Sequence, residues 1–119
     1  MKESGENYLE TILILSAHGP VRAVDVANTL GFSKPSVSRA LGILSDSGLI
    51  TQDRTGIRLT AAGRLAAENI YERHRAITSF LILTTGVDSE TAEQDACRIE
   101  HILSDATFAG IKRFLDREK

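Results

Sequence analysis

Three side chains in the last quarter of the sequence have the types and spacing of a metal site. Cys97, Glu100 and His101 stand at positions i, i+3 and i+4, so one face of a helix would carry all three about one turn apart. Thiolate, carboxylate and imidazole all bind divalent transition metals. A single cysteine usually packs as a small hydrophobe, but three such residues at this spacing favour metal binding.

Two further candidate ligands lie on other predicted helices. His74 follows Ile70 by four residues and precedes Ile77 by three, which places it on the inward face of a long helix. Glu10 lies at the border of the apolar stripe of the first helix, with Asn7 one turn before it. An inward histidine alone is more often a hydrogen-bonded core residue. With the other candidates it favours a metal site, because a divalent cation would compensate the buried carboxylates.

The elements that must position these residues follow from helical periodicity and from cap residues. Gly19-Pro20 ends the first helix, Gly31 ends the second, and Ser33 caps the third, with Pro35 in its first turn. Two short strands surround the turn Asp53-Arg54-Thr55-Gly56, and Thr60 caps a long fourth helix. The predicted helices are 6–17, 23–30, 33–47, 61–84, a fifth that is capped by Asp88 or Ser89 and ends near Leu103, and a sixth that is capped by Ser104 or Asp105; the strands are 49–52 and 57–60.

This order predicts a mainly α protein with two domains. Residues 1–60 would form a winged helix-turn-helix with a two-stranded wing, and residues 61–119 a helical dimerisation and metal-binding region. A chain of 119 residues is marginal alone, so a core shared in a homodimer would stabilise it. The side chains expected in or near that shared core are Phe108, Ile111, Phe114 and Leu115.

The start of the third helix is suited to the major groove of DNA. Small hydroxyl side chains let a helix approach the bases, Pro35 can contact a thymine methyl, and Arg39 can bind a guanine edge. The net charge is −2, but residues 33–60 carry four basic and two acidic side chains. The predicted DNA-binding residues are Ser33, Lys34, Pro35, Ser36, Ser38, Arg39 and, in the wing, Arg54 and Arg58.

Composition excludes several other classes. Met1–Glu10 has no signal-peptide pattern, and no run approaches the ~18–20 apolar residues of a membrane span. The single cysteine allows no internal disulfide, so we expect a cytoplasmic protein without a membrane partner. No arrangement of nucleophile and base stands out, so we do not expect an enzyme. A metal-independent winged-helix regulator or a protein-interaction module is the alternative to a metal-dependent regulator.

The sequence resembles the diphtheria toxin repressor family, which includes the manganese transport regulators. The motifs that carry the resemblance are Glu6–Ile12, Ser33–Arg39, Leu59-Thr60 with Gly63, Arg73–Arg75 and, most specific, Asp95–His101. The resemblance extends from about Glu6 to Leu115. It implies a homodimeric repressor that binds double-stranded operator DNA when loaded with metal.

The resemblance also implies which residues bind the metal. Glu10, His74, Cys97, Glu100 and His101 all match ligand positions of the family. At the position of Asn7 the manganese regulators have Asp and the iron-type members Met, so Asn7 departs from both patterns. At the position of Cys97 the manganese type has Glu and the iron type Cys.

The ligand chemistry predicts that Fe²⁺ is favoured and that Mn²⁺ is a weaker activator. Manganese sites prefer oxygen and imidazole, whereas iron, cobalt, nickel and zinc accept the thiolate of Cys97 better. Ligands drawn from three helices indicate five or six coordination, unlike the closed tetrahedron of structural zinc. Asn7 offers only a neutral oxygen, which disfavours a hard ion further. Co²⁺, Ni²⁺ or Zn²⁺ are expected as substitutes.

Overall fold

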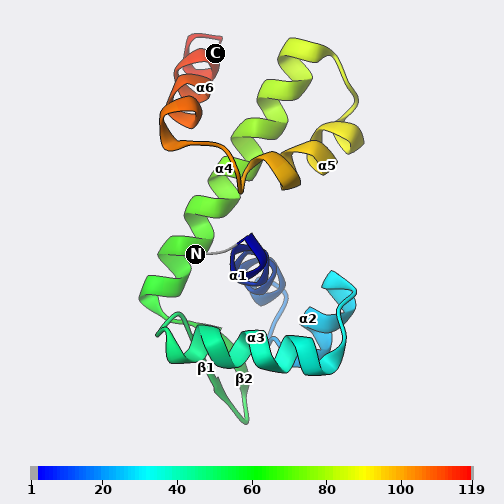
Figure 1. Ribbon diagram of the computed structural model, residues 1–119, viewed down its shortest axis with the longest axis vertical. Helices are drawn as coiled ribbons and strands as arrows, with labels where there is room; N and C mark the ends of the chain where they lie inside the picture. The colour runs from blue at the N-terminus through cyan, green and yellow to red at the C-terminus, as the bar shows by residue number, and fades with distance from the viewer. Residues whose placement is uncertain (1–2, 119) are drawn as a thin grey trace. The chain divides into compact units, whose positions relative to one another are not determined.

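The structure, a computed structural model, describes residues 3–118. It shows six helices and an antiparallel pair of strands in this range, in the order α1 (Glu3–Ser16), α2 (Ala23–Leu30), α3 (Lys34–Asp46), β1 (Ile50–Asp53), β2 (Gly56–Leu59), α4 (Ala61–Thr85), α5 (Ser89–Ile99) and α6 (Asp105–Arg117) (Figure 1). The predicted fold class, a winged helix-turn-helix followed by helices, is confirmed. Contacts divide the chain into two compact units, Met1–Glu68 and Asn69–Lys119, with the boundary inside α4.

The first unit contains the helix-turn-helix. Gly31 ends α2 in the left-handed conformation, with φ 72°, which glycine adopts without steric cost. Ser33 caps α3 by accepting a hydrogen bond from the backbone N–H of Ser36 at 3.3 Å. The apolar faces of α1, α2 and α3 meet, and their fully buried members include Leu9, Val26 and Leu41. These contacts hold the exposed face of α3 on a rigid support.

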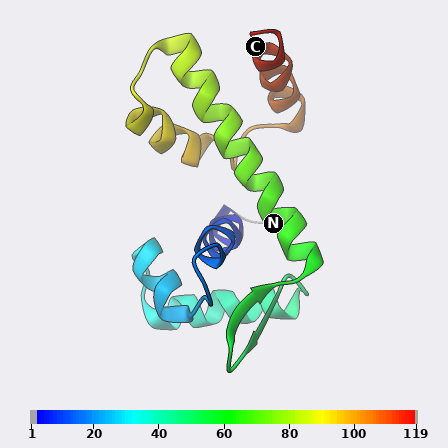
Figure 2. The same ribbon diagram turned by 180° about the vertical axis from the view of Figure 1, so that it is seen from behind.

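The wing is a tight hairpin of β1 and β2. The strands pair from Ile50 with Leu59 to Asp53 with Gly56, so two residues form the turn. Figure 2 shows the hairpin as a two-stranded ribbon that ends in this narrow turn. The segment before α2 adds a further bridge, in which the amide of Ile57 donates to the carbonyl of Val21 at 2.8 Å. The wing is therefore attached to the helices at its base.

A close backbone approach joins the helix-turn-helix to the start of α4. The hydroxyl of Thr60 donates to the carbonyl of Gly48 at 2.7 Å and accepts from the amide of Gly63 at 3.0 Å. A Cβ added to Gly63 would lie 1.8 Å from the carbonyl oxygen of Leu49. Glycine is therefore required at position 63.

The second unit has its own apolar core, built from α4, α5 and α6. Its buried members are Ile77, Ala96 and Ile111. The side chains predicted at the dimer interface pack here within their own chain: Phe108 and Leu115 contact this core, and Phe114 meets Phe80 edge-on at a centroid distance of 5.5 Å. Their role between two chains stays a prediction.

The predicted end of the fifth helix at Leu103 is wrong, because α5 ends at Ile99. The amides of Ile102 and Leu103 both donate to the carbonyl of Ile99, which closes a turn, and Ser104 then caps α6. The turn keeps both Ile99 and Leu103 against the core. Their i, i+4 spacing therefore fitted a helix equally well.

Candidate metal centre and DNA-binding surface

The end of α5 brings predicted metal ligands of the second unit together. Glu100 is the C-cap residue of α5 and is only 3% exposed, and His101 follows it in the turn. Nδ1 of His74, on α4, lies 2.9 Å from Oε2 of Glu100. The prediction that Glu100 and His101 lie on one face of a helix is therefore wrong. Glu100 caps the end of α5, His101 lies in the turn that follows, and His74 on α4 contacts Glu100.

The environment of Glu100 fits a cation. Its Oε1 is buried and has no hydrogen-bond partner among the described residues. Nε2 of His101 lies 3.2 Å from this oxygen as a close polar contact that lacks hydrogen-bond geometry. A buried carboxylate needs compensation, and the two imidazoles beside it could supply nitrogen ligands to a cation bound there. The donor set of one carboxylate and two imidazoles suits a divalent transition metal.

The other predicted ligands differ in burial. Cys97, one turn before Glu100, is exposed. Glu10 lies on α1 in the first unit and is buried, with 8% of its surface exposed, and Asn7 is half-buried on the same helix. The roles of these three residues as ligands stay predictions.

The start of α3 presents the predicted DNA-binding residues to solvent. All six of them are exposed, whereas Val37 between them is buried and anchors the helix. Arg39 is therefore available for a base edge. The hydroxyl of Ser33, by contrast, already takes part in the helix cap and also donates to Oγ of Ser36 at 3.0 Å. Ser33 and Ser36 thus hold the start of the helix in shape.

The wing carries two exposed arginines, Arg54 in its turn and Arg58 on β2. The carboxylate of Asp53 accepts hydrogen bonds from the hydroxyl and the amide of Thr55, at 2.5 and 2.8 Å. These bonds, that of the hydroxyl first, lower the pKa of Asp53. Asp53 therefore stays ionised and fixes the turn that carries Arg54.

Arg64, an exposed residue in the first turn of α4, is a further cation that was not among the predicted DNA-binding residues. Together with Arg58 and Thr55 it lines a hollow of about 390 Å³ between the end of α1 and the wing. Two guanidinium groups in one hollow suit an anion such as a DNA phosphate. The predicted DNA-binding region ends at residue 60, and Arg64 lies one turn of helix beyond it, where its charge is the signal in the sequence.

Both halves of the chain match one protein family. Residues 1–56 match the N-terminal DNA-binding domain of the iron-dependent repressors, and residues 60–119 match their metal-binding and dimerisation domain. Among the described residues, no helix has the length and apolar character needed to cross a membrane.

Individual relatives agree with this match. The transcriptional regulator MntR of Escherichia coli O157:H7 is 36% identical over 118 residues, which are 98% of this chain and 76% of MntR. The diphtheria toxin repressor of Corynebacterium diphtheriae is 34% identical over 87% of this chain and 46% of its own. The crystal structure of the metal-dependent transcriptional regulator MtsR superposes with a TM-score of 0.88 at 30% identity, over 98% of this chain and 55% of MtsR. The chain thus spans about half the length of the latter two proteins.

Proposed function

The chain belongs to the iron-dependent repressor family, and from this premise we propose that it is a transcriptional repressor that binds operator DNA as a homodimer when loaded with a divalent metal. The observation that carries the proposal is the buried carboxylate of Glu100, with His74 and His101 beside it. In the same chain, the start of α3 and the wing offer exposed cations to DNA. Regulators named for metal dependence, such as MtsR, share the fold.

For the metal, we propose that His74, Glu100 and His101 form the ligand set of the second unit. Cys97, Glu10 and Asn7 are the further candidates that the sequence offers; the first two also match ligand positions of the family. A bound divalent cation would supply positive charge that compensates the carboxylates. Glu10 and Asn7 belong to α1, so ligands from both units would favour one arrangement of the DNA-binding unit. In a dimer, that arrangement would space two α3 helices by about one DNA turn, ~34 Å.

For the dimer, we propose that the second unit supplies the contact between chains. The family match over residues 60–119 includes dimerisation. Large apolar side chains of this unit are exposed, among them Ile82, Leu83 and Ile102, the last at 78%. A partner copy would cover such a surface. Sedimentation should show a dimer at micromolar concentration, and a stable monomer there would contradict this part of the proposal.

For the metal identity, we propose that Fe²⁺ is favoured over Mn²⁺, and Cys97→Glu tests this preference. If the thiolate binds the ion, the variant should respond more to Mn²⁺ and less to Fe²⁺, because carboxylate oxygen suits manganese better than sulfur does. The measurement is DNA binding against each metal under anaerobic conditions. An unchanged order of metals would remove Cys97 from the site, in agreement with its exposure.

The experiment that tests the whole proposal is DNA binding against a panel of divalent metals. A duplex selected from a random-sequence pool with metal present would serve as the probe, and fluorescence anisotropy would report its affinity. We expect metal to raise the affinity ~5–150-fold. Tight binding to DNA that no metal changes would instead favour the metal-independent winged-helix regulator.

A further inference from the structure

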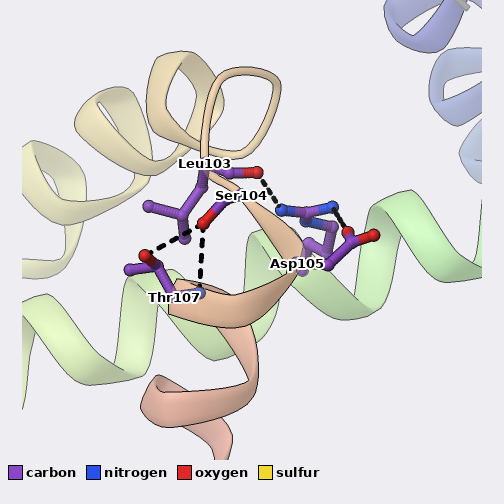
Figure 3. A network of polar contacts seen from close by, with 5 residues as sticks. Leu103, Ser104, Asp105 and Thr107 are labelled. Carbon is purple, nitrogen blue, oxygen red and sulfur yellow. Dashed lines mark hydrogen bonds and ion pairs between the residues drawn. The ribbon is translucent and has the colours of Figure 1, made fainter.

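Arg73 lies next to His74 on α4 and contacts the segment that follows the other two ligands. One terminal nitrogen of its guanidinium donates to the carbonyl of Leu103 at 2.5 Å, and the other contacts Oδ1 of Asp105 at 3.2 Å. Figure 3 shows Leu103 and Asp105 with these contacts as dashed lines, beside the cap formed by Ser104. The side chain of Arg73 is 21% exposed.

The guanidinium is also held by an aromatic ring. Its central carbon lies 4.9 Å from the centroid of the Phe108 ring, within the range of a cation–π contact. The planar guanidinium thus has acceptors at both ends and an aromatic ring beside it. Such a group has one preferred position, because its donors form a rigid fork.

The contacts of Arg73 fix the turn that carries Glu100 and His101. This turn lies between the end of α5 at Ile99 and the start of α6 at Asp105. The amide of Leu103 is bonded to the carbonyl of Ile99, at the start of the turn, while the carbonyl of Leu103 is bonded to Arg73. The turn is therefore attached to α4 one residue away from His74.

We infer that Arg73 is a positioning residue for the metal centre, which sets the distance between His74 and the turn that carries Glu100 and His101. The inference rests on the proposed function, in which these three residues bind a divalent metal. Groups outside the ligand set that hold ligands in place commonly change metal affinity 10–100-fold, so an effect of about that size is expected when the guanidinium is removed.

A second ion pair between α4 and α6 offers a matched control. Lys112 pairs with Glu72, and its Nζ lies 5.8 Å from the same Phe108 ring. The hydrogen bond from Lys112 to Glu72 raises the pKa of Lys112, so Lys112 stays charged at neutral pH. This pair joins the same two helices as Arg73 does, but no contact from it to the turn is found among the described residues. Lys112→Met therefore removes a link between α4 and α6 without releasing the turn.

The test compares the full-length wild type with Arg73→Met, Arg73→Lys and Lys112→Met. Affinities for Mn²⁺ and Co²⁺ would be measured by competition with a chromophoric chelator, without DNA. Arg73→Met should lose ~10–100-fold in affinity, Lys112→Met should bind like wild type, and Arg73→Lys should recover part of the loss, because lysine keeps the charge but not the fork. Equal losses in Arg73→Met and Lys112→Met would overturn the inference, because they would show a general loss of helix packing.

A second measurement needs no metal. Amide hydrogen exchange of Ile102 and Leu103 in the metal-free protein should be faster in Arg73→Met than in wild type and unchanged in Lys112→Met. Unchanged exchange in Arg73→Met would overturn the claim that Arg73 holds the turn.

The metal titration separates the positioning role from the proposed function. If wild type binds metal and Arg73→Met binds it equally well, the positioning role is wrong and the proposed function stands. If wild type binds no metal, the proposed function is wrong, and the positioning role falls with it.

Discussion

The two units of the chain place their functional residues in opposite ways. In the first unit, the predicted DNA-binding residues are exposed, and buried neighbours such as Val37 anchor the helix that carries them. In the second unit, Glu100 is itself buried, and its surroundings come from α4 and from the turn after α5. The difference suggests that the proposed DNA surface can be changed without loss of stability, whereas a change at the buried Glu100 also affects the interior of the second unit.

The largest expected effect of a single change is on the metal centre. Glu100→Gln removes the carboxylate charge and keeps nearly the same shape, so the fold should persist while affinity for divalent metal falls by more than ~100-fold, beyond the 10–100-fold typical of groups outside the ligand set. Chelator competition would measure the affinity and circular dichroism the fold. Metal affinity equal to that of wild type would remove Glu100 from the site.

The next prediction tests the support of the DNA surface. Gly63→Ala would place a Cβ against the carbonyl of Leu49 and should lower the free energy of unfolding by about 1–3 kcal/mol or more, as overpacking does. Gly42→Ala is the control, because nothing lies within 4 Å of its added Cβ and alanine favours helix α3. Urea denaturation would compare both variants. Equal stabilities would show that the approach of Gly63 to Leu49 relaxes easily.

The third prediction concerns the exposed arginines. Arg39→Ala should lose ~1–3 kcal/mol of binding to the selected duplex and relax its sequence preference, if the side chain contacts a base edge. Arg58→Ala should weaken binding to all duplexes alike and reduce the salt slope by ~1. Neither change should alter the melting temperature, because both side chains are exposed. Wild-type DNA binding in both variants would place the interface elsewhere.

The smallest expected effect is at the cap of α6. The side chain of Ser104 accepts from the amide of Thr107 at 3.2 Å, so Ser104→Ala should cost ~1 kcal/mol of stability. Ser104→Asn, which retains a cap acceptor, should restore most of it. Thermal unfolding would measure both variants. A cost that the asparagine leaves unrestored would show that another contact of Ser104 matters more than the cap.

The sequence was sufficient for the parts of the molecule that depend on local rules. Caps such as Ser33 and Thr60, and helix ends such as Gly31, follow from the sequence because their effect is confined to neighbouring residues. Residue types and helical spacing singled out the candidate ligands, and the family resemblance matched the same five residues to ligand positions.

The sequence was insufficient for residues whose positions depend on contacts with residues far away in the sequence. Ile99 and Leu103 are four residues apart, which is the spacing of one face of a helix, so the sequence fitted a helix that continues to Leu103. The turn that the structure has there also keeps both residues against the core. The contacts of Arg73 with Leu103 and Asp105 join residues 30 and 32 positions apart, and no local pattern indicates them. The exposure of Cys97 also depends on where α5 ends and packs.

The central claim is that the metal centre and the exposed DNA surface are coupled, and the most direct test is metal affinity with and without DNA. Affinity for Mn²⁺ would be measured for the wild type alone and when saturated with the selected duplex. Coupling is reciprocal, so the duplex should raise metal affinity by the same factor, ~5–150-fold, by which metal raises DNA affinity. Equal metal affinity in the two states would contradict the account, because it would show that the metal site and the DNA surface act independently.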